Sequence, residues 1–343
     1  MARRPIISDV ARAAGVSVAT VDRVLNGRLK VREETARKVL QAAQEVGYHA
    51  RNLIEQRLRV DLPEVRLGFI LQKEKQAFYQ RFAHQIEAAV AEADGIRGQL
   101  VMEFSASQSP DHVVEMMERM SGKVDALAAT AVNHAKVSDA VARLAKAGTP
   151  VFSLLSDFAQ GLRRNYVGSN NLKVGRMAAW MLSTAAPRPG KIALFVGGYR
   201  WHGHELRETG FRSFFREHAP ERPLLDTLVN LETRQLTYEA TLDLLHRHPD
   251  VTGIYLAGGG MEGTIEALRE VRKPGEVALV VNELTPDSRA ALADRYVTMA
   301  LETPLEPLCR ELVRLMSQAA LSTQPAVPGQ LFIDSVIHLP ESV

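Results

Sequence analysis

The sequence predicts a small all-α helix-turn-helix head, followed by a larger α/β body whose parallel, doubly wound sheets form two lobes. Three observations lead to this expectation. Basic residues are concentrated near the N-terminus, two short helical patterns flank a glycine within residues 6–26, and apolar runs of strand length alternate with helical patterns from Val65 onward. With 343 residues, the chain is long enough for two or three hydrophobic cores.

The charge is distributed unevenly along the chain. Residues 1–60 hold 12 Lys and Arg against 6 Asp and Glu, a net charge of +6, although the whole chain carries only +2. A basic module on a mildly acidic body is typical of a polyanion-binding head with a separate sensing or catalytic body. A solvated basic surface without a partner is the alternative that charge alone leaves open.

Composition excludes several classes of protein. The single cysteine, Cys309, rules out an internal disulfide and a thiolate cluster, so we expect neither structural zinc nor a disulfide framework. We also expect no cofactor. No apolar run approaches the roughly 20 residues that a membrane span needs, and the N-terminus MARRPIISDV lacks the apolar core of a secretory signal. We therefore expect a cytoplasmic protein.

The N-terminal patterns predict two helices joined by a tight turn at Gly15, with Ser8 and Ser17 as their N-caps. The residues expected to face inward are Val10, Ala11 and Ala14 in the first helix, and Val21, Val24 and Leu25 in the second. A third helix from Glu33 to about Val46 would close this core with Ala36, Val39, Leu40 and Ala43. Helix, turn and capped helix together indicate a helix-turn-helix.

If the second helix enters a DNA major groove, its outward side chains Val18, Ala19 and Arg23 can reach base edges. Arg23 can read a guanine through two hydrogen bonds, whereas the other two offer only methyl contacts. Short polar side chains that could hold phosphates are Ser8, Ser17, Thr20 and Asn26. The alternative is a helical hairpin that packs on the rest of the protein.

The segments GVSVATVDRVLNG and VREETARKVLQAAQEVGYHARN resemble the N-terminus of the LacI/GalR family of bacterial transcription regulators, and the match runs through residues 5–58. The resemblance implies a non-enzymatic regulator that binds a near-palindromic DNA operator as a homodimer or a higher homo-oligomer. It also adds Tyr48 to the expected DNA-binding residues. Asp22 is a departure, since the family commonly has serine there.

A hinge is expected at residues 49–62, after a head that spans residues 1–48. In the family this segment folds into a helix on DNA and wedges a leucine into the minor groove. Asn52 and Leu58 keep the family's spacing, but the usual proline is absent and Glu55 replaces a small residue. The negative potential of the minor groove repels an acidic side chain such as Glu55. The alternative is therefore a linker helix packed against the body.

Residues 63–343 are expected to form the effector-binding and dimerisation domain, which resembles the family's sensing domain and the periplasmic sugar-binding proteins related to it. The resemblance places the first lobe at about 63–165 and 297–323, and the second at about 166–296 and 324–343. The expected strands are VRLGFIL, LVMEF, DALAATA, PVFSLL, KIALFV, LLDTLVNL, GIYLA, VALVVN and VTMAL, and the expected helices are 78–93, 137–147, 170–184, 205–218, 234–246, 260–272 and 304–320.

Because such sheets bind ligands beyond the carboxyl ends of their strands, side chains near strand ends are the candidates for binding a carbohydrate effector. Arg207 matches an arginine that clamps ligand hydroxyls or carboxylates in relatives, and Glu283 aligns with an aspartate that accepts hydrogen bonds from sugar. The full candidate set is Gln72, Phe78, Tyr79, Asn133, His134, Asp157, Asn170, His202, Arg207, Gly258 and Glu283.

Two departures from the family bear on the ligand. Gly258, Gly259 and Gly260 follow the strand GIYLA where relatives commonly have Asn-Asp, and Asn170 replaces the usual aspartate. Exposed backbone N–H groups at a helix N-terminus would favour a ligand with a negative group, such as a sugar phosphate or a sugar acid.

Two other functions compete with this interpretation. Gly258, Gly260 and Gly263 satisfy G-x-G-x-x-G with Glu283 beyond the next strand, the pattern of an NAD(P)-binding oxidoreductase or a redox-sensing repressor. His202, His204 and Glu205 could in principle meet a metal ion, but imidazoles two residues apart seldom converge.

Overall fold

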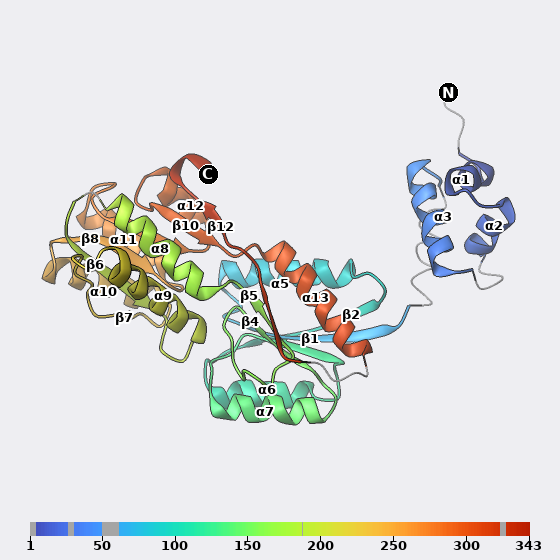
Figure 1. The fold of residues 1–343 in the computed structure, drawn as a ribbon, viewed down its shortest axis with the longest axis horizontal. Helices are drawn as coiled ribbons and strands as arrows, with labels where there is room; N and C mark the ends of the chain where they lie inside the picture. The colour runs from blue at the N-terminus through green and yellow to red at the C-terminus, as the bar shows by residue number, and fades with distance from the viewer. Residues whose placement is uncertain (1–4, 27–30, 50–61, 187, 323–326) are drawn as a thin grey trace. The chain divides into compact units, whose positions relative to one another are not determined.

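The structure is a computed structural model that describes residues 5–26, 31–49, 62–186, 188–322 and 327–343 (Figure 1). The chain divides into two compact units. One unit comprises residues 1–65 with 93–99 and contains the head, and the other comprises residues 66–92 with 100–343 and contains most of the body. Across the described ranges, no helix is long and apolar enough to cross a lipid bilayer.

The head confirms the expected helix-turn-helix with a third helix. Its helices are α1 (Ile7–Ala14), α2 (Val18–Asn26) and α3 (Glu33–Glu45). Gly15 ends α1 with a φ of 65°, in the left-handed region that glycine adopts without a steric penalty. The residues that the sequence placed inside are in one hydrophobic core, with Ala14 and Leu40 only partly buried: Val10, Ala11, Ala14, Val21, Val24, Leu25, Ala36, Val39, Leu40 and Ala43.

Of the two expected N-caps, only one is confirmed. The Ser17 hydroxyl accepts a hydrogen bond from the Thr20 N–H at 3.1 Å, as an N-cap does. The expectation for Ser8 is wrong, because α1 begins one residue before it, with Ile6 at the N-cap position. Asp9 takes the capping role instead, since its carboxylate accepts a hydrogen bond from the Ile6 N–H at 2.9 Å.

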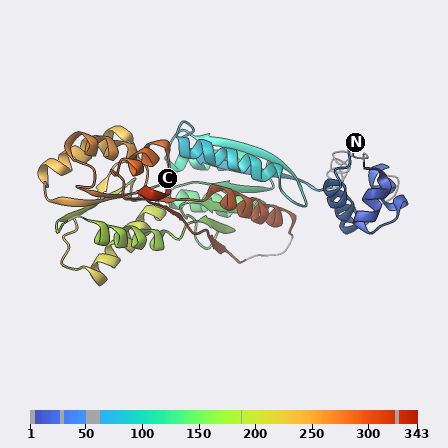
Figure 2. The ribbon, with the colours of Figure 1, turned by 90° about the horizontal axis from the view of Figure 1, so that it is seen from above.

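The body contains two sheets, each of which forms the centre of one lobe (Figures 1 and 2). The first-lobe sheet has the order β11-β5-β4-β3-β1-β2, and the second-lobe sheet has the order β12-β10-β9-β8-β6-β7. The strands are β1 (Glu64–Gln72), β2 (Arg97–Ser105), β3 (Ala126–Ala129), β4 (Val151–Leu154), β5 (Asn165–Gly168), β6 (Lys191–Val196), β7 (Leu228–Val229), β8 (Val251–Leu256), β9 (Ala278–Asn282), β10 (Met299–Glu302), β11 (Gly329–Phe332) and β12 (Val336–His338). The expected parallel pairing is confirmed for β1–β3, β3–β4, β8–β9 and β9–β10, among others, whereas β12 runs antiparallel to β10.

Helices cover both faces of each sheet, as the doubly wound prediction requires. They are α5 (Ala77–Ala91), α6 (Pro110–Met120), α7 (Ala135–Lys146), α8 (Asn171–Ala185), α9 (His202–His218), α10 (Arg234–Arg247), α11 (Met261–Val271), α12 (Pro286–Ala293) and α13 (Leu305–Leu321), followed by the short 3-10 helix η1 (Pro340–Ser342). In the first lobe, α6 and α7 pack on one face of the sheet, and α5 and α13 lie together (Figure 1). In the second lobe, α8 and α9 pack on one face, and α10, α11 and α12 pack on the other.

The lobe boundaries differ from those expected. The sheet order places β5 and β11 in the first lobe and β10 in the second, so the chain crosses between lobes after Gly168, after Glu302 and after Phe332. The boundaries expected at 166, 297 and 324 are therefore wrong by several residues. The segment VTMAL, which contains most of β10, lies in the second lobe because β10 pairs in parallel with β9. The edge strand β11 is half exposed, and its hydrophobic pattern is too weak for the strand to be recognised from the sequence.

Candidate functional site

One face of α2 presents the side chains that the sequence assigned to base contacts. Val18, Ala19 and Arg23 are exposed, and the Val18 side chain is among the exposed large hydrophobic groups of the chain at 45%. Ser17 is exposed, and its hydroxyl lies 2.9 Å from the hydroxyl of the half-buried Thr20. The opposite face of α2 is buried in the head core. The helix therefore has an apolar inner face and an outer face that can meet a groove.

Other head residues are placed differently from the expectation. Asn26, which was expected to hold a phosphate, donates its side-chain amide to the Asp22 carboxylate at 2.6 Å. The Tyr48 ring is buried in the head core and contacts the His49 ring, so it stabilises the head rather than presenting its ring to a groove. Asn52 and Leu58 lie outside the described residues.

In the body, a cavity of about 410 Å³ opens between the lobes at the carboxyl ends of the strands. Side chains from both lobes line it. The first lobe contributes Phe78, Tyr79, Thr130 and Ser156, among others, and the second contributes Trp201, His204, Arg207, Glu232, Gly258, Asn282, Glu283 and Thr303, among others. Its size and its mixture of aromatic and polar groups fit a small organic ligand.

Five of the candidate effector residues line this cavity: Phe78, Tyr79, Arg207, Gly258 and Glu283. The other six do not: Gln72, Asn133, His134, Asp157, Asn170 and His202. The strand-end rule identified the edge of each sheet where the cavity lies, but it did not separate side chains that face the cavity from those that stabilise the loops.

The six residues outside the cavity have local roles. The Gln72 amide donates to the Thr130 carbonyl, and Asn133 donates its backbone N–H to the Arg200 carbonyl. His134 and Asn170 cap helices, since each side chain accepts a backbone N–H of the helix that follows. His202 lies 3.2 Å from the exposed Glu205.

Asp157 is buried in an ion pair with Arg163, and the two side chains are 5% and 4% exposed. The Arg163 Nε and Nη2 atoms each donate at 2.7 Å to a different carboxylate oxygen of Asp157, and the Ser153 hydroxyl donates as well. Burial alone would raise the pKa of Asp157, but the hydrogen bonds from Arg163 and Ser153 and the guanidinium charge lower it. Asp157 is therefore a structural residue of the first lobe.

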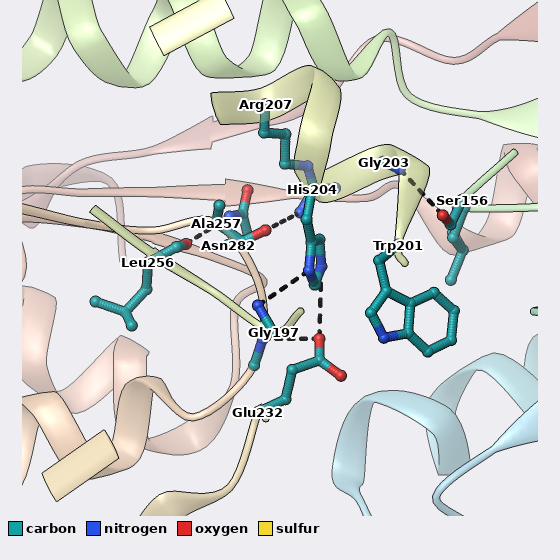
Figure 3. A network of polar contacts seen from close by, with 12 residues as sticks. Ser156, Gly197, Trp201, Gly203, His204, Arg207, Glu232, Leu256, Ala257 and Asn282 are labelled. Carbon is teal, nitrogen blue, oxygen red and sulfur yellow. Dashed lines mark hydrogen bonds and ion pairs between the residues drawn. The ribbon is translucent and has the colours of Figure 1, made fainter. Parts of the chain in front are cut away.

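Arg207 is held from two sides. Its Nε donates to the Asn171 amide oxygen at 2.7 Å. Its Nη1 donates to the Ala257 carbonyl at 2.6 Å (Figure 3). Close contact between α8 and α9 brings these groups together, since a Cβ at Gly175 would lie 1.9 Å from the Arg207 carbonyl oxygen. The guanidinium is therefore fixed at the cavity wall before a ligand arrives.

Glu283 follows β9 and adopts a φ of 74°, which is rare for a residue with a side chain. The Thr303 hydroxyl and N–H donate to its two carboxylate oxygens at 2.6 and 3.2 Å. Burial raises the pKa of Glu283 to about 7, against the lowering effect of these hydrogen bonds. The nearby Tyr79 hydroxyl also has a raised pKa, because of burial and the negative charges of Glu232 and Glu283.

Sequence reasoning missed a polar cluster at the second-lobe wall, formed by His204 and Glu232 (Figure 3). The His204 Nδ1 atom accepts the Gly197 N–H at 3.1 Å, which leaves Nε2 to carry the proton, 3.5 Å from Glu232 Oε1. Burial lowers the pKa of His204 to about 4, so the imidazole is neutral at pH 7. The pattern HGHE drew attention to what proves to be the start of α9, but no sequence signal connected His204 to Glu232, which is 28 positions away.

The three glycines Gly258, Gly259 and Gly260 allow His204 and Glu232 to lie against the backbone, because they carry no side chains. A Cβ at Gly258 would lie 2.6 Å from His204 Cε1, and the Gly259 N–H donates to Glu232 Oε1 at 3.1 Å. A Cβ at Gly263 would lie 2.2 Å from the Arg234 carbonyl oxygen of the neighbouring helix. These glycines therefore allow close internal contacts, which accounts for the G-x-G-x-x-G pattern without a dinucleotide.

The same contact bears on the expectation of an anionic ligand. A carboxylate of the chain itself already accepts the Gly259 N–H, and a ligand phosphate or carboxylate would have to displace it. The imidazole of His204 faces Glu232, whereas His202 pairs with Glu205, so the two histidines do not share a partner. Within the described part of the chain, no group of three or more His, Cys, Asp or Glu side chains could hold a metal ion.

Comparison with known families gives two matches. The family of bacterial regulatory proteins, lacI family, matches residues 6–51, and the periplasmic binding protein domain matches residues 67–321, more than half of the chain. The chain belongs to the lacI family. Its head is that family's DNA-binding domain, and its body is a periplasmic-binding-protein domain.

Three relatives of this lacI-family protein illustrate the similarity. The regulator GalS of Salmonella typhimurium is 23% identical over 97% of this chain and 95% of its own length. The ribitol operon repressor of Klebsiella aerogenes is 31% identical over 57% of this chain and 70% of its own length. An uncharacterised regulator of Streptomyces limosus is 27% identical over 62% of this chain, which spans 58% of that relative.

Solved structures show the same fold in the body. A periplasmic solute-binding protein of Actinobacillus succinogenes with bound D-allose has a TM-score of 0.72 at 19% identity, and covers 81% of this chain and 98% of its own. A solute-binding protein of Burkholderia graminis in complex with D-arabinose has a TM-score of 0.73 at 18% identity, and covers 82% of this chain and 97% of its own. The body therefore has the same two-lobed fold as these two solute-binding proteins.

Proposed function

We propose that this protein is a non-enzymatic transcriptional repressor that binds a near-palindromic operator as a homodimer and responds to a carbohydrate effector between its lobes. The observation that carries the proposal is the combination of an exposed α2 face in a lacI-type head with an interlobe cavity lined by aromatic and hydrogen-bonding groups. The relatives named as GalS and the ribitol operon repressor support control of a sugar or polyol operon. Binding to DNA implies action in the bacterial cytoplasm.

In the head, the roles divide by chemistry. Arg23 is suited to a bidentate contact with guanine, and the exposed Val18 and Ala19 offer methyl contacts to thymine. Ser17 and Asn26 are placed near the ends of α2, where short polar groups meet phosphates. Two copies related by a twofold axis would read two half-sites, which gives the operator its palindromic form.

In the body, the cavity chemistry suits a polyol. Arg207 supplies a fixed planar donor, and the carboxylate of Glu283 supplies acceptors for hydroxyl groups. The amide oxygen of Asn282 is a further acceptor, since its amide nitrogen already donates to Leu256 and Tyr255. Phe78 and Trp201 add aromatic surface that can cover the apolar face of a sugar ring. Because Gly259 already has an internal carboxylate partner, a neutral carbohydrate fits this cavity better than a sugar phosphate or a sugar acid.

The head is tested by DNA binding. Fluorescence anisotropy with promoter fragments from the neighbouring genes should show sequence-specific binding whose affinity falls with salt. Arg23→Ala should relax base preference at one position of each half-site. Lys38→Ala is the matched control, because it also removes one positive charge but from an ion pair with Glu34 on α3. Equal base preference in both variants would count against α2 as the reading helix.

The body is tested by a thermal-shift screen against neutral carbohydrates and their phosphates. A ligand at 100 times its Kd stabilises a protein by about 2.7 kcal/mol, which is a shift of several degrees in Tm. We expect neutral carbohydrates to give this shift and Glu283→Gln to reduce it. A shift with phosphorylated sugars alone, or with none of the carbohydrates, would refute the assignment.

A further inference from the structure

Near the cavity, an ion pair joins the two lobes. Lys73 follows β1 of the first lobe, and Glu232 follows β7 of the second. The Lys73 Nζ atom donates to Glu232 Oε2 at 2.6 Å, and the two side chains are 21% and 15% exposed. We propose that this pair is an ionic latch that holds the lobes together before any effector binds.

The second lobe is built around the Glu232 end of the latch. A Cβ at Gly197 would lie 2.4 Å from the Glu232 Cγ atom, and one at Gly259 would lie 3.1 Å from its Cβ atom. The Gly259 N–H and the His204 imidazole face Oε1, which leaves Oε2 for Lys73. The carboxylate is thus fixed by its own lobe, and only its last partner comes from the other lobe.

The backbone on both sides of the latch adopts uncommon conformations. Lys73 has a φ of 44°, and the consecutive residues Leu231 and Glu232 have φ values of 49° and 55°. Residues with a side chain rarely adopt this left-handed region, and they keep it where surrounding contacts impose it. Here it directs two charged side chains from separate lobes toward each other.

The latch differs from the other ion pair that joins the lobes in the described residues. Arg81 of α5 and Glu302 of β10 lie 3.4 Å apart, and the Arg81 side chain is 44% exposed. Solvent and salt screen such a pair, so it contributes little. Lys73 and Glu232 are closer and more buried, and removal of either charge leaves the other without its partner at the lobe interface. Separation of the lobes would let water solvate that charge.

The latch determines what fraction of the protein is in the closed arrangement before an effector binds. A protein whose binding-competent state is only partly populated shows an apparent affinity reduced by that fraction. With the latch intact, the closed arrangement dominates in the absence of effector. Without it, part of the effector's binding free energy is spent on closure.

The experiment measures the distance between lobes in the full-length, effector-free protein. Spin labels are placed at two exposed positions, through Lys146→Cys on α7 and His246→Cys on α10. The native Cys309 is buried, and burial raises the pKa of its thiol to about 12, so it does not react with the label. Labelled chains are mixed with an excess of unlabelled protein, so that only distances within one chain are recorded. Pulsed dipolar spectroscopy then gives the distribution of distances between the two labels.

We expect the unsubstituted latch to give one narrow distribution, and both Lys73→Met and Glu232→Gln to add a population at longer distance. Glu232→Gln keeps an oxygen to accept the Gly259 N–H, so it tests the charge alone if Lys73→Met fails to fold. Arg81→Met is the matched control and should leave the distribution unchanged. The latch is disproved if the folded latch variants match the wild type, or if Arg81→Met opens the lobes as much. This measurement needs neither DNA nor effector, so its failure is separate from failure of the proposed repressor function.

Discussion

The assignment of Asp157 to stability rather than ligand binding can be tested by one substitution. Asp157→Asn keeps the size of the side chain but leaves the buried Arg163 guanidinium without a counter-charge. Loss of one partner of a buried ion pair costs about 3–5 kcal/mol. For a body of this size, where 1 kcal/mol corresponds to a few degrees, we expect Tm to fall by about 6–15 °C.

Circular dichroism during heating, at pH 7 and without effector, measures this change. The control is Asp111→Asn, because Asp111 pairs with Lys136 on the surface and its side chain is 64% exposed. This control should change stability by less than about 0.5 kcal/mol. An Asp157→Asn protein with wild-type stability but weakened effector binding would show that our reassignment is mistaken.

The pH dependence of the same variant gives a second test of Asp157. Its folded-state pKa is lowered, so its contribution to stability is complete above the unfolded-state pKa of about 4. That contribution disappears as the pH falls toward the lowered folded-state pKa. The difference in stability between wild type and Asp157→Asn should therefore shrink as the pH is lowered from about 5 to about 2. A difference that stays constant over this range would contradict the role of the charge.

Three further predictions concern the remaining contacts. Burial raises the pKa of Glu283 to about 7, so calorimetry should show effector affinity rising as the pH increases through that value, because the ionised carboxylate accepts ligand hydroxyls better. Glu283→Gln should remove this pH dependence. A wild-type affinity that does not change with pH would argue against a contact between Glu283 and the effector. Gly175→Ala places a Cβ 1.9 Å from the Arg207 carbonyl oxygen, so thermal melts should show a loss of about 1–3 kcal/mol, and an unchanged Tm would mean that α8 and α9 can separate. Ser17→Ala removes the cap of α2 and should lower head stability by about 1 kcal/mol and weaken DNA binding about equally for all sequences, because a phosphate contact carries no base preference, whereas Ser8→Ala should leave the stability nearly unchanged.

The head was predictable because its signals are local. Gly15, the Ser17 cap and the apolar positions of α2 are short-range features, and the structure confirms each of them. Ser8 was mistaken for a cap because the competing carboxylate of Asp9 is equally near in sequence. Tyr48 was assigned by resemblance, and its burial depends on three helices packing together.

The body was predictable in its architecture and only partly in its site. Strand ends pointed to the edge of each sheet where the cavity lies, which is why Phe78 and Glu283 line it, and Arg207, which the resemblance supplied, lines it as well. Asp157 was misassigned because its partner, Arg163, is a loop residue and no sequence pattern marks their pairing. Glu232 was missed because its role depends on contacts with loops that lie far away in sequence.

The central claim is that an effector in the interlobe cavity changes DNA binding by the head. Its most direct test is an anisotropy titration of operator DNA with the full-length protein, with and without a saturating carbohydrate identified in the thermal-shift screen. The account predicts a change in operator affinity of at least about fivefold, the lower end of typical allosteric coupling, that Glu283→Gln diminishes. Identical operator affinity at saturating effector would contradict it.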